Sequence, residues 1–214
     1  MGARKRLEGY RGCSYRIEPL QLGALLRFTI RGGSIVTPRL CISQAQAGGI
    51  RSHLLESARG TEEVAFVFAT WDALKGGRFR AVDWYAVPPG GFLFCSAWHF
   101  ELSDETRGLV IKRAHDLGVS LIEVHSHIDP EPPAFSPSDL YGFEEFVPHV
   151  WWRLRGRPYA AFVMSAGGLD GLAWIGEPGI AERMAGIEVA GRLHPASLRS
   201  SLKWAPDTGR FSHE

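Results

Sequence analysis

The sequence predicts a single domain of mixed α/β class, of the α+β type, in which a mixed β-sheet is flanked by helices. Three observations support this class: short apolar runs typical of buried strands recur along the chain, amphipathic segments lie between them, and no repeat of about 20 to 50 residues is present. A chain of 214 residues is long enough for one sizeable domain with a substantial core. We expect an N-terminal extension at residues 1–36, the domain at 37–195 and a polar tail at 196–214.

The N-terminal half is expected to contain one helix and several strands. Ser43 is a suitable N-cap, and Gly60 follows the last apolar residue of the segment that it opens, so a helix is predicted over 44–58. Short apolar or alternating runs predict the strands. The predicted strands are 39–43, 62–70 and 78–87, together with a strand-like patch at 25–30 in the extension. Residues 92–102 are predicted to form a loop followed by a strand.

The C-terminal half opens with the clearest helix signal. A helix is predicted between Ser103, a suitable N-cap, and Gly118, which ends it. Asp104 and Glu105 in the first turn support it, because acidic side chains are favourable at the N-terminus of a helix. A second helix is predicted over 139–154, with Pro148 as a kink. The remaining apolar runs predict strands at 119–127, 159–166, 171–176 and 186–192.

Composition excludes several classes of function. The chain carries 24 basic and 23 acidic residues, so no net field attracts it to nucleic acid or to an anionic membrane. No apolar run is long enough to span a bilayer, and the basic N-terminus is not followed by an apolar signal segment. The three cysteines are widely spaced and form no C-x-x-C pair, which favours a reducing compartment. We therefore expect a cytoplasmic protein.

Two histidines one residue apart and a downstream aspartate form the candidate metal site. His125 and His127 end the predicted strand at 119–127, and residues i and i+2 of a strand point to the same face. Ser136 and Asp139 follow at a loop-to-helix junction, from which Asp139 can turn its carboxylate back toward the histidines. Two imidazoles, one carboxylate and a water make the open tetrahedral site of catalytic zinc. We predict one Zn²⁺ held by His125, His127 and Asp139.

The order H-S-H, loop, S-x-x-D resembles the signature of the JAMM zinc metalloproteases of the MPN type, many of which are deubiquitinases. The family also carries an upstream glutamate in the form E-x-x-G-L-x-x-G, where a buried strand begins. Glu62 matches that glutamate if Ala65, Phe66 and Ala69 stand for the family's Gly, Leu and Gly. The resemblance covers roughly residues 37–178 and implies an MPN/cytidine-deaminase-like fold.

The chain departs from the family pattern in three places. Ile128 replaces the proline that follows the second histidine, the loop at 128–135 is one residue longer than usual, and alanines replace two glycines. None of these changes removes a ligand. Glu63 is an alternative to Glu62, and we favour Glu62 because its spacing to the apolar run matches the family.

The resemblance also implies catalytic roles. Zinc lowers the pKa of bound water to about 7, which makes hydroxide available at neutral pH. Glu62 would take the proton of the water and pass it to the leaving nitrogen. Ser136 would donate a hydrogen bond to the oxyanion of the tetrahedral intermediate.

The implied substrate is a peptide or isopeptide bond that follows the C-terminal tail of a ubiquitin-like protein, in a precursor or in a conjugate. A compact chain of this kind is similar to prokaryotic JAMM proteins of ubiquitin-like conjugation systems, some of them in antiviral defence, so the activating and conjugating enzymes are expected further partners. Two alternatives stay open. One is a hydrolase that processes sulfur-carrier adducts with the same zinc site, and the other is a non-catalytic MPN scaffold.

Overall fold

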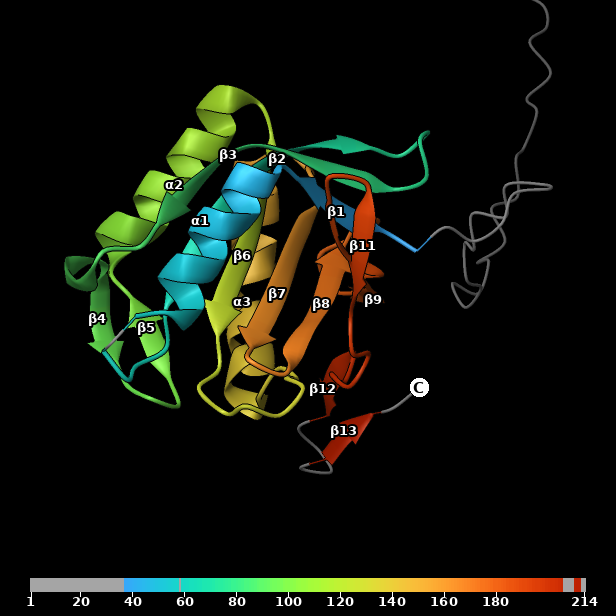
Figure 1. Ribbon diagram of the computed structural model, residues 1–214. Coiled ribbons are helices and arrows are strands. Elements are labelled where there is room, and N and C mark those ends of the chain that lie inside the picture. The colour runs from blue at the N-terminus through green and yellow to red at the C-terminus, as the bar shows by residue number, and fades with distance from the viewer. Residues whose placement is uncertain (1–36, 58, 206–209, 213–214) are drawn as a thin grey trace, which may run out of the picture. The chain divides into compact units, whose positions relative to one another are not determined.

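The structure is a computed structural model that describes residues 37–57, 59–205 and 210–212. The predicted extension, with its strand-like patch at 25–30, lies outside the described residues. The described chain forms one mixed α/β domain in which a large curled sheet is flanked by three helices (Figure 1). The predicted class is confirmed at this level.

The sheet contains nine strands of the described chain, in the spatial order β11-β10-β1-β3-β2-β6-β7-β8-β9. It is mixed, because β6 runs parallel to β7 and β1 runs parallel to both β3 and β10, whereas the other neighbours are antiparallel. The strands are β1 (Arg39–Ile42), β2 (Val64–Asp72), β3 (Arg78–Ala86), β6 (Ser120–Ser126), β7 (Tyr159–Ser165), β8 (Gly168–Trp174), β9 (Glu182–Arg183), β10 (Gly186–Val189) and β11 (Arg192–Pro195). Two small antiparallel pairs lie apart from this sheet: β4 (Phe92–Cys95) with β5 (Phe100–Leu102), and β12 (Lys203–Ala205) with β13 (Arg210–Ser212).

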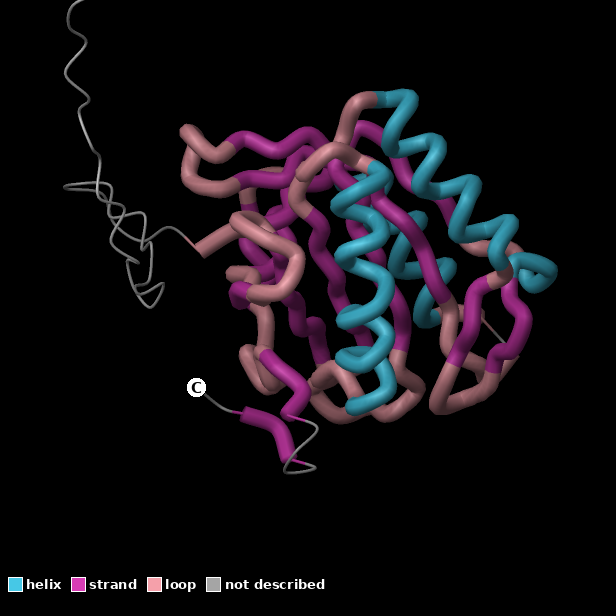
Figure 2. Tube along the Cα trace, turned by 180° about the vertical axis from the view of Figure 1, so that it is seen from behind, coloured by secondary structure: helices cyan, strands magenta, loops and turns pink. Residues whose placement is uncertain are grey.

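The three helices cover the two faces of the sheet. Helix α1 (Gln44–Leu55) packs on one face, and α2 (Asp104–Leu117) and α3 (Pro137–Arg153) pack on the other, as Figure 1 and the view from behind in Figure 2 show. Strand β2 alternates between them, because Phe66 packs with residues of α2 and α3 whereas Val67 packs with residues of α1. Burial on both faces explains the continuous apolar runs of the central strands.

The caps of α2 agree with the prediction, but other boundaries do not. Ser103 accepts a hydrogen bond from the backbone of Thr106, and Gly118 ends the helix with a φ of 69° in the left-handed region. Helix α1 ends at Leu55, short of the predicted residue 58, and α3 begins at Pro137, before the predicted residue 139. Proline is well suited to this first helical position, since its missing N–H would have no partner there.

Two strand predictions were also incomplete. Residues 92–102, predicted as a loop and one strand, form the antiparallel pair of β4 and β5. The predicted strand at 186–192 is broken after Val189 by a turn in which Ala190 has a φ of 48°, and the chain then returns as β11. In both cases a turn divides the segment into two short antiparallel strands.

Among the described residues, no helix combines the length and the apolar character that crossing a bilayer requires.

Candidate metal centre

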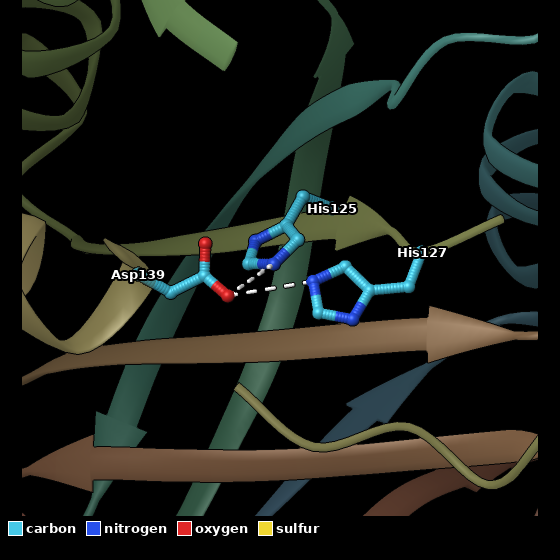
Figure 3. A group of neighbouring side chains, drawn as sticks. All are labelled: His125, His127 and Asp139. Atoms are coloured by element: carbon cyan, nitrogen blue, oxygen red, sulfur yellow. Dashed lines mark ion pairs between the residues drawn. The ribbon is translucent and has the colours of Figure 1, made fainter. Parts of the chain in front are cut away.

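The two histidines and the aspartate of the motif meet at one end of the sheet (Figure 3). His125 lies near the end of β6, His127 follows the strand, and Asp139 lies in the first turn of α3. Asp139 Oδ2 is 3.6 Å from His125 Nε2 and 3.4 Å from His127 Nε2. One potential ligand atom from each side chain lies within 4.8 Å of the other two, so the group could hold a metal ion.

The buried imidazole of His125 provides a test of whether the site fits a metal. Its side chain is 1% exposed, and among the described residues Nε2 has no hydrogen-bond partner. Nδ1 lies 3.2 Å from Glu123 Oε1, so in the neutral ring, the form that binds a metal, the proton belongs on Nδ1 and the lone pair of Nε2 points toward Asp139 and His127. A buried nitrogen without a partner is costly, and a metal ion would satisfy it.

The carboxylates around His125 also favour the binding of a cation at this site. Burial disfavours the charged imidazolium, but the carboxylates of Asp139 and Glu123 outweigh burial and raise the pKa of His125 to about 10. Burial likewise opposes ionisation of Asp139. The charge of His125 and hydrogen bonding to His127 and to the backbone of Ser136 nevertheless hold the pKa of Asp139 well below its ordinary value. A metal cation would therefore meet an ionised carboxylate.

Glu123 positions the imidazole of His125, a role that was not predicted from the sequence. Its Oε1 faces Nδ1 of His125, and its Oε2 accepts a hydrogen bond of 3.1 Å from the hydroxyl of Tyr159. Glu123 and Tyr159 are buried on neighbouring parallel strands, β6 and β7. A glutamate two residues before His125, inside the predicted strand at 119–127, was the available signal, since both side chains share one face.

Glu123→Gln is expected to weaken zinc binding about 10- to 100-fold, because the carboxylate both orients His125 and increases the basicity of its ring. The measurement is a competition titration of the metal-free protein against a chromophoric chelator. Glu105→Gln is the matched control, since Glu105 is exposed on α2. Equal zinc affinity in wild type and Glu123→Gln would contradict this role.

Glu62 lies beside the three candidate ligands. It lies two residues before the start of β2, is 3% exposed, and its Oε1 is 3.7 Å from His127 Nε2. Its backbone is fixed by the β4–β5 pair, since its N–H donates to Ser96 O and its carbonyl accepts from the thiol of Cys95. Burial raises the pKa of Glu62 above its ordinary value, which makes it a better proton acceptor near neutral pH.

Glu63 points to a different part of the domain. Its carboxylate pairs with Arg59 at 2.5 Å and accepts a hydrogen bond of 2.8 Å from Ser57. Its backbone N–H donates to the hydroxyl of Ser126, the residue between the two histidines. Consecutive side chains of an extended segment point in opposite directions, so only one of the two glutamates reaches the histidines.

Ser136 and Asp139 form a capping box at the start of α3. Ser136 Oγ accepts from the backbone N–H of Asp139 at 3.2 Å, and Asp139 Oδ2 accepts from the backbone N–H of Ser136 at 2.7 Å. The same Oδ2 is the oxygen that faces both histidines. The helix cap therefore fixes the orientation of the candidate ligand.

The loop between the second histidine and α3, residues 128–135, is held by segments distant in sequence. Ser165 Oγ donates to Glu131 O at 2.7 Å, and the hydroxyl of Ser200 accepts from the backbone of Phe135 at 2.9 Å. Ser200 belongs to the segment predicted as a polar tail, yet it is 1% exposed. This first part of the segment therefore packs against the loop that positions Ser136.

Asp170 anchors that C-terminal segment. Its buried carboxylate accepts backbone hydrogen bonds from Leu198 at 3.1 Å and Ser200 at 2.7 Å. Asp170→Ala is expected to lower the free energy of unfolding by about 3 kcal/mol, because it leaves these donors without their charged acceptor. Denaturant unfolding measures the effect, with the exposed Asp104→Ala as control at within about 0.5 kcal/mol of wild type. Equal destabilisation by the two variants would contradict the anchor.

No family model matches the chain, and no curated protein matches its sequence. Among solved structures, the domain is similar to the solution structure of protein DSY2949 from Desulfitobacterium hafniense. The two share 15% sequence identity and a TM-score of 0.50 over 72% of this chain and 94% of that chain. At this identity the similarity concerns the fold alone.

Proposed function

We propose that the chain is a zinc-dependent peptidase or isopeptidase of the JAMM/MPN type, with an MPN-like fold. The observation that carries the proposal is the position of the Glu62 carboxylate, 3.7 Å from His127, beside the group formed by His125, His127 and Asp139. A proton acceptor next to an open two-histidine, one-carboxylate group is the arrangement that metal-assisted hydrolysis requires. The resemblance of H-S-H and S-x-x-D to the family signature supports the same reaction.

Zinc is the metal that this donor set favours. Imidazole suits zinc and other transition metals, whereas Mg²⁺ and Ca²⁺ prefer sites made of oxygen ligands. When bound, Zn²⁺ supplies a Lewis acid that polarises a carbonyl group and makes water acidic near neutral pH. His125, His127 and Asp139 would hold it.

Glu62 carries the proton chemistry in this proposal. Its pKa is raised by burial, so the carboxylate can take a proton from water and the resulting acid can give it to the leaving amine. The hydrogen bond from Glu62 N to Ser96 O, 2.8 Å long, fixes the backbone that carries it. Little reorganisation is then needed between the two proton transfers.

Ser136 is the proposed oxyanion donor. Its Oγ accepts from Asp139 N, which leaves the hydroxyl proton available for substrate. Ser136→Gly is expected to lower kcat about 100-fold through loss of this donor. Glycine is a tolerable N-cap, so α3 should lose only a few tenths of a kcal/mol. Steady-state kinetics and thermal unfolding separate the two effects, and unchanged kcat in Ser136→Gly would refute the oxyanion role.

A ubiquitin-like tail is the proposed substrate. A cavity of about 820 Å³ lies between β5, α2 and α3, and its lining includes Asp139 together with Phe100 and Phe143. An extended tail needs a partly apolar surface of this kind beside the reacting bond. We propose that the protein acts in the cytoplasm of a bacterium, on precursors or conjugates formed by cognate activating and conjugating enzymes.

The test is incubation of the full chain with a ubiquitin-like protein that extends beyond its terminal glycine, with and without a zinc chelator. The expected result is cleavage after the glycine that the chelator stops and added zinc restores. Cleavage that persists in the chelator would overturn the metal mechanism. Absence of cleavage by the zinc-loaded protein would favour the sulfur-carrier or scaffold alternative.

A further inference from the structure

Three arginines gather on one face of the sheet, at the end of β2 opposite the metal centre. Arg39 on β1 aligns with Arg78 on β3, and two residues further on Cys41 aligns with Arg80. The residues between them, such as Leu40 and Phe79, belong to the core under α1, so the three arginines lie on the other face. We call Arg39, Arg78 and Arg80 the arginine cluster.

The cluster has few acidic partners. Arg39 Nη1 lies 3.4 Å from Glu188 Oε2 on β10, and no other carboxylate of the described residues lies within 4.0 Å of the three guanidinium groups. Asp72 aligns with Arg78 across β2 and β3, but it accepts the backbone N–H of Lys75 and pairs with that lysine instead. Positive charge is therefore in excess at this face.

Buried donors without a partner are the second observation. The Nε atoms of Arg39 and Arg78 are both buried, and neither has a hydrogen-bond partner in the part of the chain that the structure describes. Like charges directly opposite each other on neighbouring strands destabilise a sheet. An oxyanion would relieve this repulsion and accept the unused N–H groups.

We propose that the arginine cluster binds a phosphate group. The planar guanidinium presents parallel N–H donors that match two oxygens of a phosphate, and three such groups on adjacent strands surround one anion. Strands lie about 4.8 Å apart, so Arg39 and Arg78 can reach the same phosphate. Arg80 is exposed, so the cluster is open to solvent on that side. Both a free phosphate and the phosphate group of a nucleotide can therefore approach it.

This site is separate from the proposed zinc centre. Val64 aligns with His125 at one end of β2, and Asp72 aligns with Arg78 at the other. The eight residue steps between them span roughly 26 Å at about 3.3 Å per residue. Phosphate binding is therefore expected to be the same in Glu62→Gln as in wild type, so this proposal can fail or succeed independently of the peptidase.

The experiment is isothermal titration of the full chain with inorganic phosphate and, separately, with adenosine 5′-monophosphate, in chloride buffer of constant ionic strength. We expect saturable binding that Arg78→Gln weakens at least tenfold. Arg192→Gln is the matched control, because Arg192 is exposed on β11 of the same sheet and should bind as wild type does. Arg80→Gln, at an exposed position, serves as a second variant if Arg78→Gln does not fold.

The two titrants distinguish the source of the phosphate. Tighter binding of the nucleotide supports a nucleotide ligand, and equal binding supports a free phosphate; both results support the site. Absence of saturable binding of either titrant to wild type overturns the proposal. The proposal is also overturned if the control Arg192→Gln weakens binding as much as Arg78→Gln does, or as much as Arg80→Gln where that variant is used instead. The attraction would then come from the overall charge of the protein.

Discussion

Glu62→Gln is expected to keep its zinc and to lose about 10²- to 10⁴-fold in turnover. The carboxylate of Glu62 lies 3.7 Å from His127 and its pKa is raised by burial, which suits it to proton transfer. Glutamine has nearly the same shape but cannot accept and return a proton. Steady-state cleavage of the extended ubiquitin-like protein measures turnover, and atomic absorption measures zinc in the same sample.

The neighbouring glutamate provides a matched control for this variant. Glu63 is equally buried, but its carboxylate pairs with Arg59 and Ser57. Glu63→Gln is therefore expected to lower stability while keeping turnover close to that of wild type. If Glu63→Gln lost turnover and Glu62→Gln retained it, the assignment of the proton acceptor would be reversed.

Asp139→Ala is expected to lose both the metal and all cleavage. Asp139 Oδ2 faces both histidines and also accepts the backbone N–H of Ser136, so its removal deletes a ligand and half of the capping box of α3. Loss of this hydrogen bond to the backbone of Ser136 should add about 1 kcal/mol of destabilisation. Zinc content after dialysis, cleavage and unfolding free energy are the three measurements.

A nearby aspartate separates ligand loss from a general loss of charge. Asp129 is exposed in the loop after His127, and its side chain bonds only the backbone of Glu131 among described residues. Asp129→Ala is expected to keep zinc and cleavage. Retention of stoichiometric zinc by Asp139→Ala would show that the metal is held elsewhere.

Local patterns in the sequence predicted the parts of the fold and site that depend on neighbouring residues. Strand alternation places His125 and His127 on one face, and the structure brings them together with Asp139. The caps of α2 follow from Ser103 and Gly118 for the same reason. A signal of this kind needs only a few adjacent residues and the geometry of one helix or strand.

Contacts between distant segments could not be predicted in this way. The hydrogen bond from the backbone of Phe135 to Ser200 joins residues 65 positions apart, and the one from the backbone of Ser200 to Asp170 joins residues 30 positions apart. Nothing in the polar composition of residues 196–214 distinguishes a packed segment from a free tail. The hydrogen bond between Glu123 and Tyr159 depends on the parallel pairing of β6 with β7, which only the assembled sheet defines.

The measurement that tests the metal centre most directly is anomalous X-ray diffraction at the zinc edge, from crystals of the full chain equilibrated with zinc. The predicted result is one strong peak bonded to His125 Nε2, His127 Nε2 and Asp139 Oδ2, with Glu62 beside it but not bonded to it. A map without a peak between these three residues, or with zinc bound only by other side chains, would contradict the account.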